Sequence, residues 1–254
     1  MSKVAIILRG HSIRKGMANY NSIEVDFNCD RGSITSLKTN IIAPLKTLYD
    51  TVDVYCCPSN TGSEEYLIKE LSPNVFYKEC ICENQLNNMI HALKSIPQET
   101  NSPKYDAVFI TRFDLLYKKP ITEWGIVNDS CDLYFPYRDP WWDEAVPCYN
   151  VPDIFHWINN KRDGYSKFIE VMEWANGAGS QWMFGTSLHS LVNLIIKSGI
   201  DINYCFMCDG VHSTNSSPIC PGCNQYGIGF NNPFCAHSGR HYFFDDFTSS
   251  CFLK

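Results

Sequence analysis

The sequence predicts an α/β fold in which helices flank a mostly parallel β-sheet. Short apolar runs, typical of buried strands, alternate with segments of helical periodicity over residues 1–115. Each pair of runs is separated by enough chain for the helical crossover that parallel strands require. Hydrophobic residues make up 44% of the 254 residues, which is enough to build one sizeable core.

Four strands are expected in this first part of the chain. They cover residues 3–8, 52–57, 74–78 and 105–111. Each run is rich in Val, Ile, Phe or Tyr, residue types that favour strands, and Pro58 ends the second run. The order of strands and helices predicts a Rossmann-like sheet with right-handed crossovers.

Three helices are expected between these strands. The first begins at Ser36, the second covers residues 62–71, and the third lies between residues 86 and 93. The apolar positions that mark the first and third helices are Leu37, Ile41, Leu45 and Leu48, and Leu86, Met89, Ile90 and Leu93. Their spacing puts each set on one helix face. Residues 15–35 and 97–104 are expected to be loops.

The remainder of the chain is less regular. Strands are expected over residues 131–136 and 200–206, and helices from Asp163 and over residues 183–197. Residues 151–157 fit either a strand or the start of a helix. We expect a main domain of residues 1–208 and a Cys- and Gly-rich C-terminal extension of residues 209–254, a small lobe packed on the same domain.

Charge and hydropathy exclude several classes of protein. The formal net charge is −6, whereas proteins that bind nucleic acid are usually basic, so no nucleic-acid partner is expected. No run is long enough for a transmembrane helix, and residues 4–8 are too short for a signal-peptide core. We therefore expect a cytoplasmic protein whose thirteen Cys are mostly free thiols or metal ligands.

Polar side chains follow three of the predicted strands, at the sheet edge where ligands bind in such folds. The candidate ligand-binding residues are Arg9, Gly10, His11, Ser59, Asn60, Arg112 and Asp114. A carboxylate at a strand end binds divalent cations, and an arginine gives bidentate contacts to phosphate. Alternatives remain open: an Arg112–Asp114 ion pair that closes the sheet edge, and ordinary solvated charge at Arg9 and His11.

Residues 105–117 (YDAVFITRFDLLY) resemble a segment of GT-A-like glycosyltransferases found in large DNA viruses and in bacterial surface-polysaccharide clusters. Residues 4–11 (VAIILRGH), 52–55 (VDVY) and 209–215 (DGVHSTN) are similar to further segments of that family, in the same order. The Arg-x-Asp of this family, here Arg112 and Asp114, stands where other GT-A enzymes have Asp-x-Asp.

This resemblance implies a GT-A-like nucleotide-sugar transferase, a hexosyl- or pentosyltransferase. The implied partners are a nucleotide-diphosphate sugar donor and a glycan or glycoprotein acceptor, in the host cytoplasm if the protein is viral. The implied cofactor is Mn²⁺ or Mg²⁺ at Asp114, which neutralises the leaving diphosphate. Because Arg112 replaces the first Asp, either Asp114 alone holds the cation or the cation is dispensable. Whether transfer inverts or retains configuration stays open.

An inverting transfer also needs a general base for the acceptor hydroxyl. Asp153 and Asp143 are the catalytic candidates, and the apolar neighbours of Asp153 would make its carboxylate a better base. The alternative role of Asp153 is an N-cap for a helix over residues 154–157. Trp141 and Trp142 either stack on the acceptor sugar or pack on the core as a lid.

The C-terminal cysteines form two C-x-x-C pairs. Cys205, Cys208, Cys220 and Cys223 have the spacing of a structural zinc site. Alternatively, Cys205 is simply buried in an apolar strand, and Cys220 and Cys223 form a redox pair. Two rival functions follow. One is a zinc-organised interaction module on an inactive transferase fold. The other is another Rossmann-like nucleotide-dependent enzyme, which the lack of a G-x-G-x-x-G motif disfavours.

Overall fold

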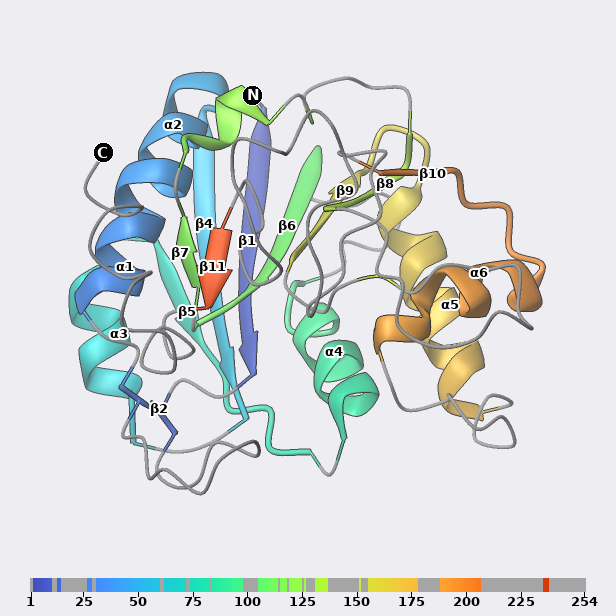
Figure 1. Cartoon of the computed structure of the whole chain (residues 1–254), viewed down its shortest axis with the longest axis horizontal. Coiled ribbons are helices and arrows are strands. Elements are labelled where there is room, and N and C mark those ends of the chain that lie inside the picture. Colours follow the sequence, from blue (N-terminus) through green and yellow to red (C-terminus); the bar gives the residue numbers. More distant parts are fainter. Residues whose placement is uncertain are drawn as a thin grey trace, which may run out of the picture.

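We describe the protein from a computed structural model of the whole chain (Figure 1). The described residues are 2–10, 13–14, 27–28, 31–59, 62–71, 74–82, 84–97, 105–113, 115–117, 119–124, 126, 131–136, 151, 155–177, 188–206 and 235–237. Within these ranges, no helix combines the length and the apolar character needed to cross a membrane.

A seven-stranded sheet forms the centre of the molecule, in the order β10-β8-β9-β6-β1-β4-β5. Its strands are β1 (Lys3–Gly10), β4 (Thr51–Pro58), β5 (Val75–Tyr77), β6 (Ala107–Arg112), β8 (Leu133–Phe135), β9 (Phe155–Asn159) and β10 (Tyr204–Phe206). β1 pairs in parallel with β4 and β6, β4 with β5, and β8 with β10. Only β9 runs antiparallel to its neighbours in this sheet. The predicted mostly parallel α/β sheet is confirmed.

Helices cover both faces of the sheet (Figure 1). One face carries α1 (Arg31–Leu37), the π-helical turn η1 (Lys38–Ile42), α2 (Ala43–Leu48) and α3 (Glu64–Leu71). The other carries α4 (Gln85–Leu93), α5 (Gly164–Gly177) and α6 (Leu191–Ser198). Shorter elements are β2 (Ile13–Arg14), β3 (Phe27–Asn28), β7 (Leu115–Tyr117), β11 (Cys235–His237), η2 (Ile121–Glu123) and η4 (Leu188–Ser190).

The central strand β1 is buried on both faces. Val4, Ile6 and Leu8 pack against the α1–α3 side, whereas Ala5 and Ile7 pack against the α4–α6 side. A strand covered by helices on both faces needs a continuous apolar run, since neither face meets water. This explains why residues 3–8 were recognisable as a strand without any alternation of polar residues.

The first helix differs from its predicted start. It begins at Arg31, five residues before Ser36, and residues 31–35 are therefore helical and not part of a loop. Ile34 is 3% exposed and extends the buried stripe of Leu37, Ile41 and Leu45 by one turn. Leu48, predicted on the same face, is 44% exposed. Leu48 is the last residue of α2, so the buried stripe ends one turn earlier, at Leu45.

The ambiguous segment at residues 151–157 resolves as a strand. Phe155 to Asn159 form β9, and Phe155 pairs with Thr111 of β6. The alternative that Asp153 caps a helix over residues 154–157 is therefore wrong. The helix predicted over residues 183–197 is observed as η4 and α6, from Leu188 onwards, and residues 183–187 lie outside the described part.

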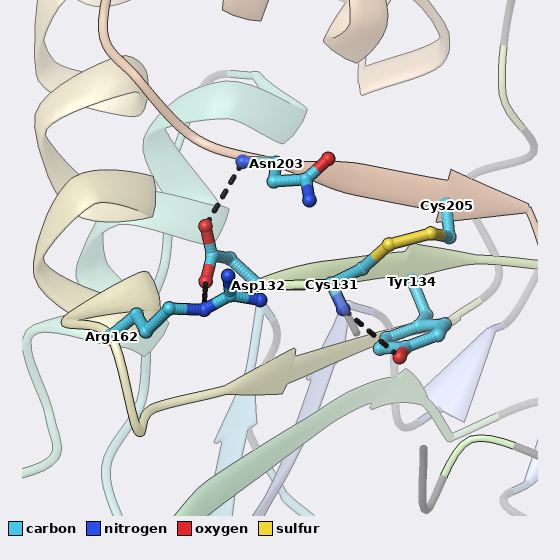
Figure 2. The surroundings of a disulfide bond; sticks show 6 residues. All are labelled: Cys131, Asp132, Tyr134, Arg162, Asn203 and Cys205. Carbon is cyan, nitrogen blue, oxygen red and sulfur yellow. Dashed lines mark hydrogen bonds and ion pairs between the residues drawn. A yellow bond between two sulfur atoms is a disulfide. The ribbon is translucent and has the colours of Figure 1, made fainter. Parts of the chain in front are cut away.

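A disulfide joins Cys131, just before β8, to Cys205 in β10 (Figure 2). A hydrogen bond next to this disulfide joins the same two segments. The carboxylate of Asp132 accepts it from the Asn203 amide at 3.0 Å. The other carboxylate oxygen of Asp132 lies 3.2 Å from Nε of Arg162, at the start of α5 (Figure 2). The disulfide and the Asn203 hydrogen bond thus tie edge strand β10 to β8, and the ion pair joins Asp132 to the turn before α5.

This disulfide corrects one proposed zinc ligand. A sulfur bonded to the Cys131 sulfur is not a thiolate, so Cys205 is not available to zinc while the bond is closed. Its proposed partners, Cys208, Cys220 and Cys223, lie outside the described residues. A disulfide is also typical of proteins that fold in oxidising surroundings, so it weighs against the predicted reducing cytoplasm.

We expect loss of this disulfide to destabilise the protein by about 2–4 kcal/mol, because it closes a loop of 74 residues. Urea unfolding of Cys131→Ser, Cys205→Ser and the double variant checks this. The three variants should be equally destabilised, and wild-type protein in dithiothreitol should match them. A Cys131→Ser variant as stable as the oxidised wild type would contradict the prediction.

Candidate functional site

The order of the strands creates a topological switch point between β1 and β6. From β1 the chain moves to β4 and then to β5 on one side, and it returns as β6 on the other side of β1. The crossover helices change faces at the same point (Figure 1). In open α/β sheets, ligands bind in the crevice beyond the carboxyl ends of the two strands at this point. Arg9 and Arg112 are at those ends.

Arg9 and Arg112 are direct neighbours across the switch point. They pair in register between the parallel strands β1 and β6. Ile7 and Ile110, two residues earlier on each strand, both pack in the core on the α4–α6 side. Because side chains alternate along a strand, both arginines leave the sheet on that same side. Arg9 is 3% exposed, and Arg112 is partly exposed.

The arrangement of these two arginines favours the binding of an anion between them. Neighbouring strands lie about 4.8 Å apart, so two guanidinium groups start from adjacent positions on one face. Like charges this close repel each other, and a bound anion converts that repulsion into attraction. Each guanidinium also presents a planar fork of donors that matches phosphate oxygens. A diphosphate, with two adjacent anionic groups, fits a pair of arginines.

Gly10 and Ser59 shape the neighbouring strand ends. Gly10 has a φ of +88°, a left-handed conformation that glycine adopts without strain. Its carbonyl accepts a hydrogen bond from the Ser59 amide at 2.8 Å, directly after the last paired residue of β4. The last residue of β1 is thereby held against the end of β4. His11 and Asn60, the next predicted residues, lie outside the described part.

Asp114 itself is not among the described residues, but both of its neighbours are. Phe113 is 2% exposed and Leu115 is 1% exposed, and both belong to the core on the α1–α3 side. The chain on either side of Asp114 is therefore anchored between β6 and β7. β11 pairs antiparallel with β7, and His237 lies opposite Leu115 in that ladder. The backbone of residues 235–237 thus runs beside the segment that follows Asp114.

Polar side chains from the first helix hold β7 in place. Ser36 Oγ accepts a hydrogen bond from the Tyr117 amide at 3.1 Å, and Asn40 Nδ2 donates to the Tyr117 carbonyl at 2.6 Å. The Tyr117 hydroxyl lies 2.6 Å from the Thr111 hydroxyl on β6. The sequence-based interpretation missed these supports. Their available signal was the i, i+4 spacing of Ser36 and Asn40 on one predicted helix.

Strand β9, which follows Asp153 in the sequence, begins at the same edge of the sheet. Val151 and Phe155 are both fully buried, two residues before and after Asp153. Because β9 runs antiparallel to β6, it begins where β6 ends, and Phe155 pairs with the residue next to Arg112. Asp153 itself lies outside the described residues, as do Asp143, Trp141 and Trp142, so their roles stay predictions.

No cation site is formed by the described side chains alone. Among them, no three His, Cys, Asp or Glu residues come close enough together to hold a metal ion. The predicted cation ligand, Asp114, is not in that set. A carboxylate remains a ligand type that fits Mn²⁺ or Mg²⁺, both of which prefer oxygen donors.

Comparisons with known proteins describe the fold only. No protein-family model and no curated protein matches the sequence. A 4-diphosphocytidyl-2C-methyl-D-erythritol synthase from Anaerococcus prevotii superposes with a TM-score of 0.48 and 10% identity, over 81% of this chain and 86% of that chain. Mouse xyloside xylosyltransferase 1 gives a TM-score of 0.45 and 9% identity, over 82% and 84%.

A third structure is a glycosyltransferase involved in the glycosylation of the major capsid of PBCV-1. It superposes with a TM-score of 0.40 and 11% identity, over 81% of each chain. These values are too low to carry an argument about activity. The chemistry of this chain therefore has to be inferred from its own residues.

Proposed function

We propose that this protein is a GT-A-like glycosyltransferase, which moves a hexosyl or pentosyl group from a nucleotide-diphosphate sugar to a glycan or glycoprotein. The observation that carries the proposal is the in-register pair Arg9 and Arg112 at the switch point of the sheet. The resemblance of residues 105–117 to the Arg-x-Asp segment of that family supports it.

The arginine pair would bind the diphosphate and stabilise it as it leaves. In the reaction, the bond from the sugar's anomeric carbon to the diphosphate oxygen breaks, and a bond to the acceptor oxygen forms. Negative charge grows on the departing diphosphate, so fixed positive charges stabilise the transition state more than the ground state. Asp114 would hold a divalent cation, which supplies further charge neutralisation at the same phosphates.

In this proposal, residues that precede β9 in the sequence bind the acceptor. If transfer inverts configuration, Asp153 or Asp143 would take the proton of the acceptor hydroxyl. The start of β9 beside the end of β6 supports Asp153, because it brings the chain next to Asp153 close to Arg112. Trp141 and Trp142 would stack on the apolar face of the acceptor sugar. Catalysis would come mainly from positioning the two substrates.

A thermal-shift screen tests this proposal. Nucleoside diphosphates, nucleoside triphosphates and nucleotide sugars are added with and without Mn²⁺. A ligand at a hundred times its dissociation constant stabilises the fold by about 2.7 kcal/mol, which for a chain of this size raises Tm by roughly 5–10 °C. We expect one nucleotide class to give this response, and Arg112→Gln to lose it.

Arg162→Gln is the control, because it removes the same guanidinium charge from an arginine that pairs with Asp132 at the far side of the sheet. It should keep the nucleotide response, measured from its own baseline. A response to nucleoside triphosphates alone would favour another nucleotide-dependent enzyme. No response across the panel, with zinc present in the purified protein, would favour the interaction module.

A further inference from the structure

Tyr117, at the end of β7, is held by polar contacts to two other parts of the chain. Its side chain is buried, with 4% exposed. Its backbone amide donates to Ser36 of α1, and its carbonyl accepts from Asn40 of η1. Its hydroxyl lies 2.6 Å from the hydroxyl of Thr111, which is fully buried in β6. One residue thus connects β6, β7 and the helical segment of residues 31–42.

The bond between the two hydroxyls joins the ends of the segment that carries two of the proposed donor-binding residues. Thr111 comes directly before Arg112, and Thr111 and Tyr117 each lie three positions from Asp114 in the sequence. Among the described residues, β7 pairs with β11 and is not a strand of the seven-stranded sheet. Side-chain hydrogen bonds therefore take the place of a backbone ladder in fixing β7 against β6.

This bond lies behind the proposed site, on the α1–α3 side of the sheet. Tyr117 packs in the core on that side, and its ring centroid is 6.4 Å from that of Phe109 and 6.1 Å from that of Trp124. Arg112, one residue after Thr111, leaves the sheet on the opposite side. The Tyr117 hydroxyl can therefore influence a ligand at the arginines only through the backbone between them.

We propose that Tyr117 is a positioning residue for the donor site. Its bond to Thr111 fixes residues 112–114, and it thereby sets where the Arg112 guanidinium and the Asp114 carboxylate meet the diphosphate and its cation. This inference rests on the proposed function of those two residues. Because both hydroxyls are buried, water cannot readily replace the bond when one of them is removed, and the segment loses an anchor.

Binding of a nucleoside diphosphate to the full-length protein tests this role. The diphosphates of adenosine, cytidine, guanosine, uridine and thymidine are titrated by calorimetry, with and without Mn²⁺, and the one that wild type binds most tightly is then used for the variants. We expect Tyr117→Phe to weaken its binding by about tenfold or more, the lower end of the losses seen when a group that orients a ligand-binding residue is removed. Weakening without Mn²⁺ indicates an effect through Arg112, and weakening only with Mn²⁺ indicates an effect through Asp114.

Variants of Thr111 separate positioning from a general loss of stability. Thr111→Val removes the other hydroxyl and should weaken binding as much as Tyr117→Phe does; it replaces Tyr117→Phe if that variant does not fold. The double variant should bind no more weakly than either single variant, because all three lack the same bond. Thr111→Ser keeps a hydroxyl and should bind within about twofold of wild type.

Tyr165→Phe is the matched control, because it also removes a buried tyrosine hydroxyl. Tyr165 is 1% exposed, and its hydroxyl donates to the Leu93 carbonyl. Its amide bonds to the Asn160 side chain, which also donates to the Tyr105 carbonyl before β6 begins. The control hydroxyl thus lies towards the opposite end of β6 from Arg112. Tyr165→Phe should lose stability and still bind the diphosphate as wild type does.

The possible outcomes distinguish this role from the proposed function. Wild-type binding in folded Tyr117→Phe and Thr111→Val, or equal weakening in Tyr165→Phe, would overturn the positioning role and leave the proposed function standing. Circular dichroism establishes that each variant is folded. A wild type that binds none of the five diphosphates would overturn the proposed function, and the role of Tyr117 with it.

Discussion

Replacing Asp114 with asparagine should reduce sugar transfer by at least about 100-fold, the scale seen when an enzyme loses one stabilising group for transition-state charge. The substitution keeps the shape of the side chain and removes its charge, and with it the ligand proposed for the divalent cation. The fold should survive, because the buried neighbours Phe113 and Leu115 are unchanged. Transfer from the donor identified by thermal shift is the measurement, together with circular dichroism of the variant.

Asp106→Asn is the matched control for this result. Asp106 precedes the opposite end of the same strand, β6, and its carboxylate accepts a hydrogen bond from the Lys3 amide at 2.7 Å. An asparagine oxygen can accept the same bond, so transfer should stay within about twofold of wild type, in keeping with the small effects typical of exposed sites. A folded Asp114→Asn variant with full activity would remove Asp114 from the site.

Gly164→Ala should destabilise the protein by about 2–4 kcal/mol, the range of strong overpacking effects in protein cores. Gly164 begins α5 where the helix passes close to the end of β9. A methyl group there would overlap the carbonyl oxygen of Asn159 and would lie 3.1 Å from that of Asp132. Both are backbone atoms, and the Asp132 carbonyl accepts a hydrogen bond from the Asn159 amide at 2.8 Å, so it cannot rotate away without losing that bond.

Gly177→Ala, at the other end of the same helix, is the matched control. No atom lies within 4 Å of a methyl group added at Gly177. Alanine also favours a helix more than glycine does, so this variant should be as stable as wild type or up to about 1 kcal/mol more stable. Urea unfolding of both variants is the measurement. Equal stability of the two would show that the helix start is not packed as described.

The first half of the fold was predictable because three of its strands, β1, β4 and β6, are buried on both faces. A run such as residues 3–8, short and rich in Val and Ile, favours a buried strand, and the helical stripes between such runs favour parallel pairing. The second half was harder, because β9 is antiparallel and its short apolar run fits a strand or a helix equally well. The π-helical turn at residues 38–42 has no pattern that a simple periodicity would show.

The candidate site was also predictable only in part from the sequence. Strand ends indicated Arg9 and Arg112 as ligand-binding residues, because ligands bind at the carboxyl edge of parallel sheets. Spacing also indicated Cys205 as a zinc ligand, and here it was misleading, since Cys131 lies 74 residues away in sequence and yet forms a disulfide with it. A motif defined by local spacing contains no information about a distant competing partner.

The sequence by itself determined the residue types and the order of the elements: a mostly parallel sheet, arginines after two of its strands, and an Asp114 placed beyond β6. Only the tertiary structure decided which of these residues are neighbours. Strand order and register brought Arg9 beside Arg112. The physical reason is that local periodicity reports which face of an element is buried, whereas pairing between strands depends on the packing of the whole chain.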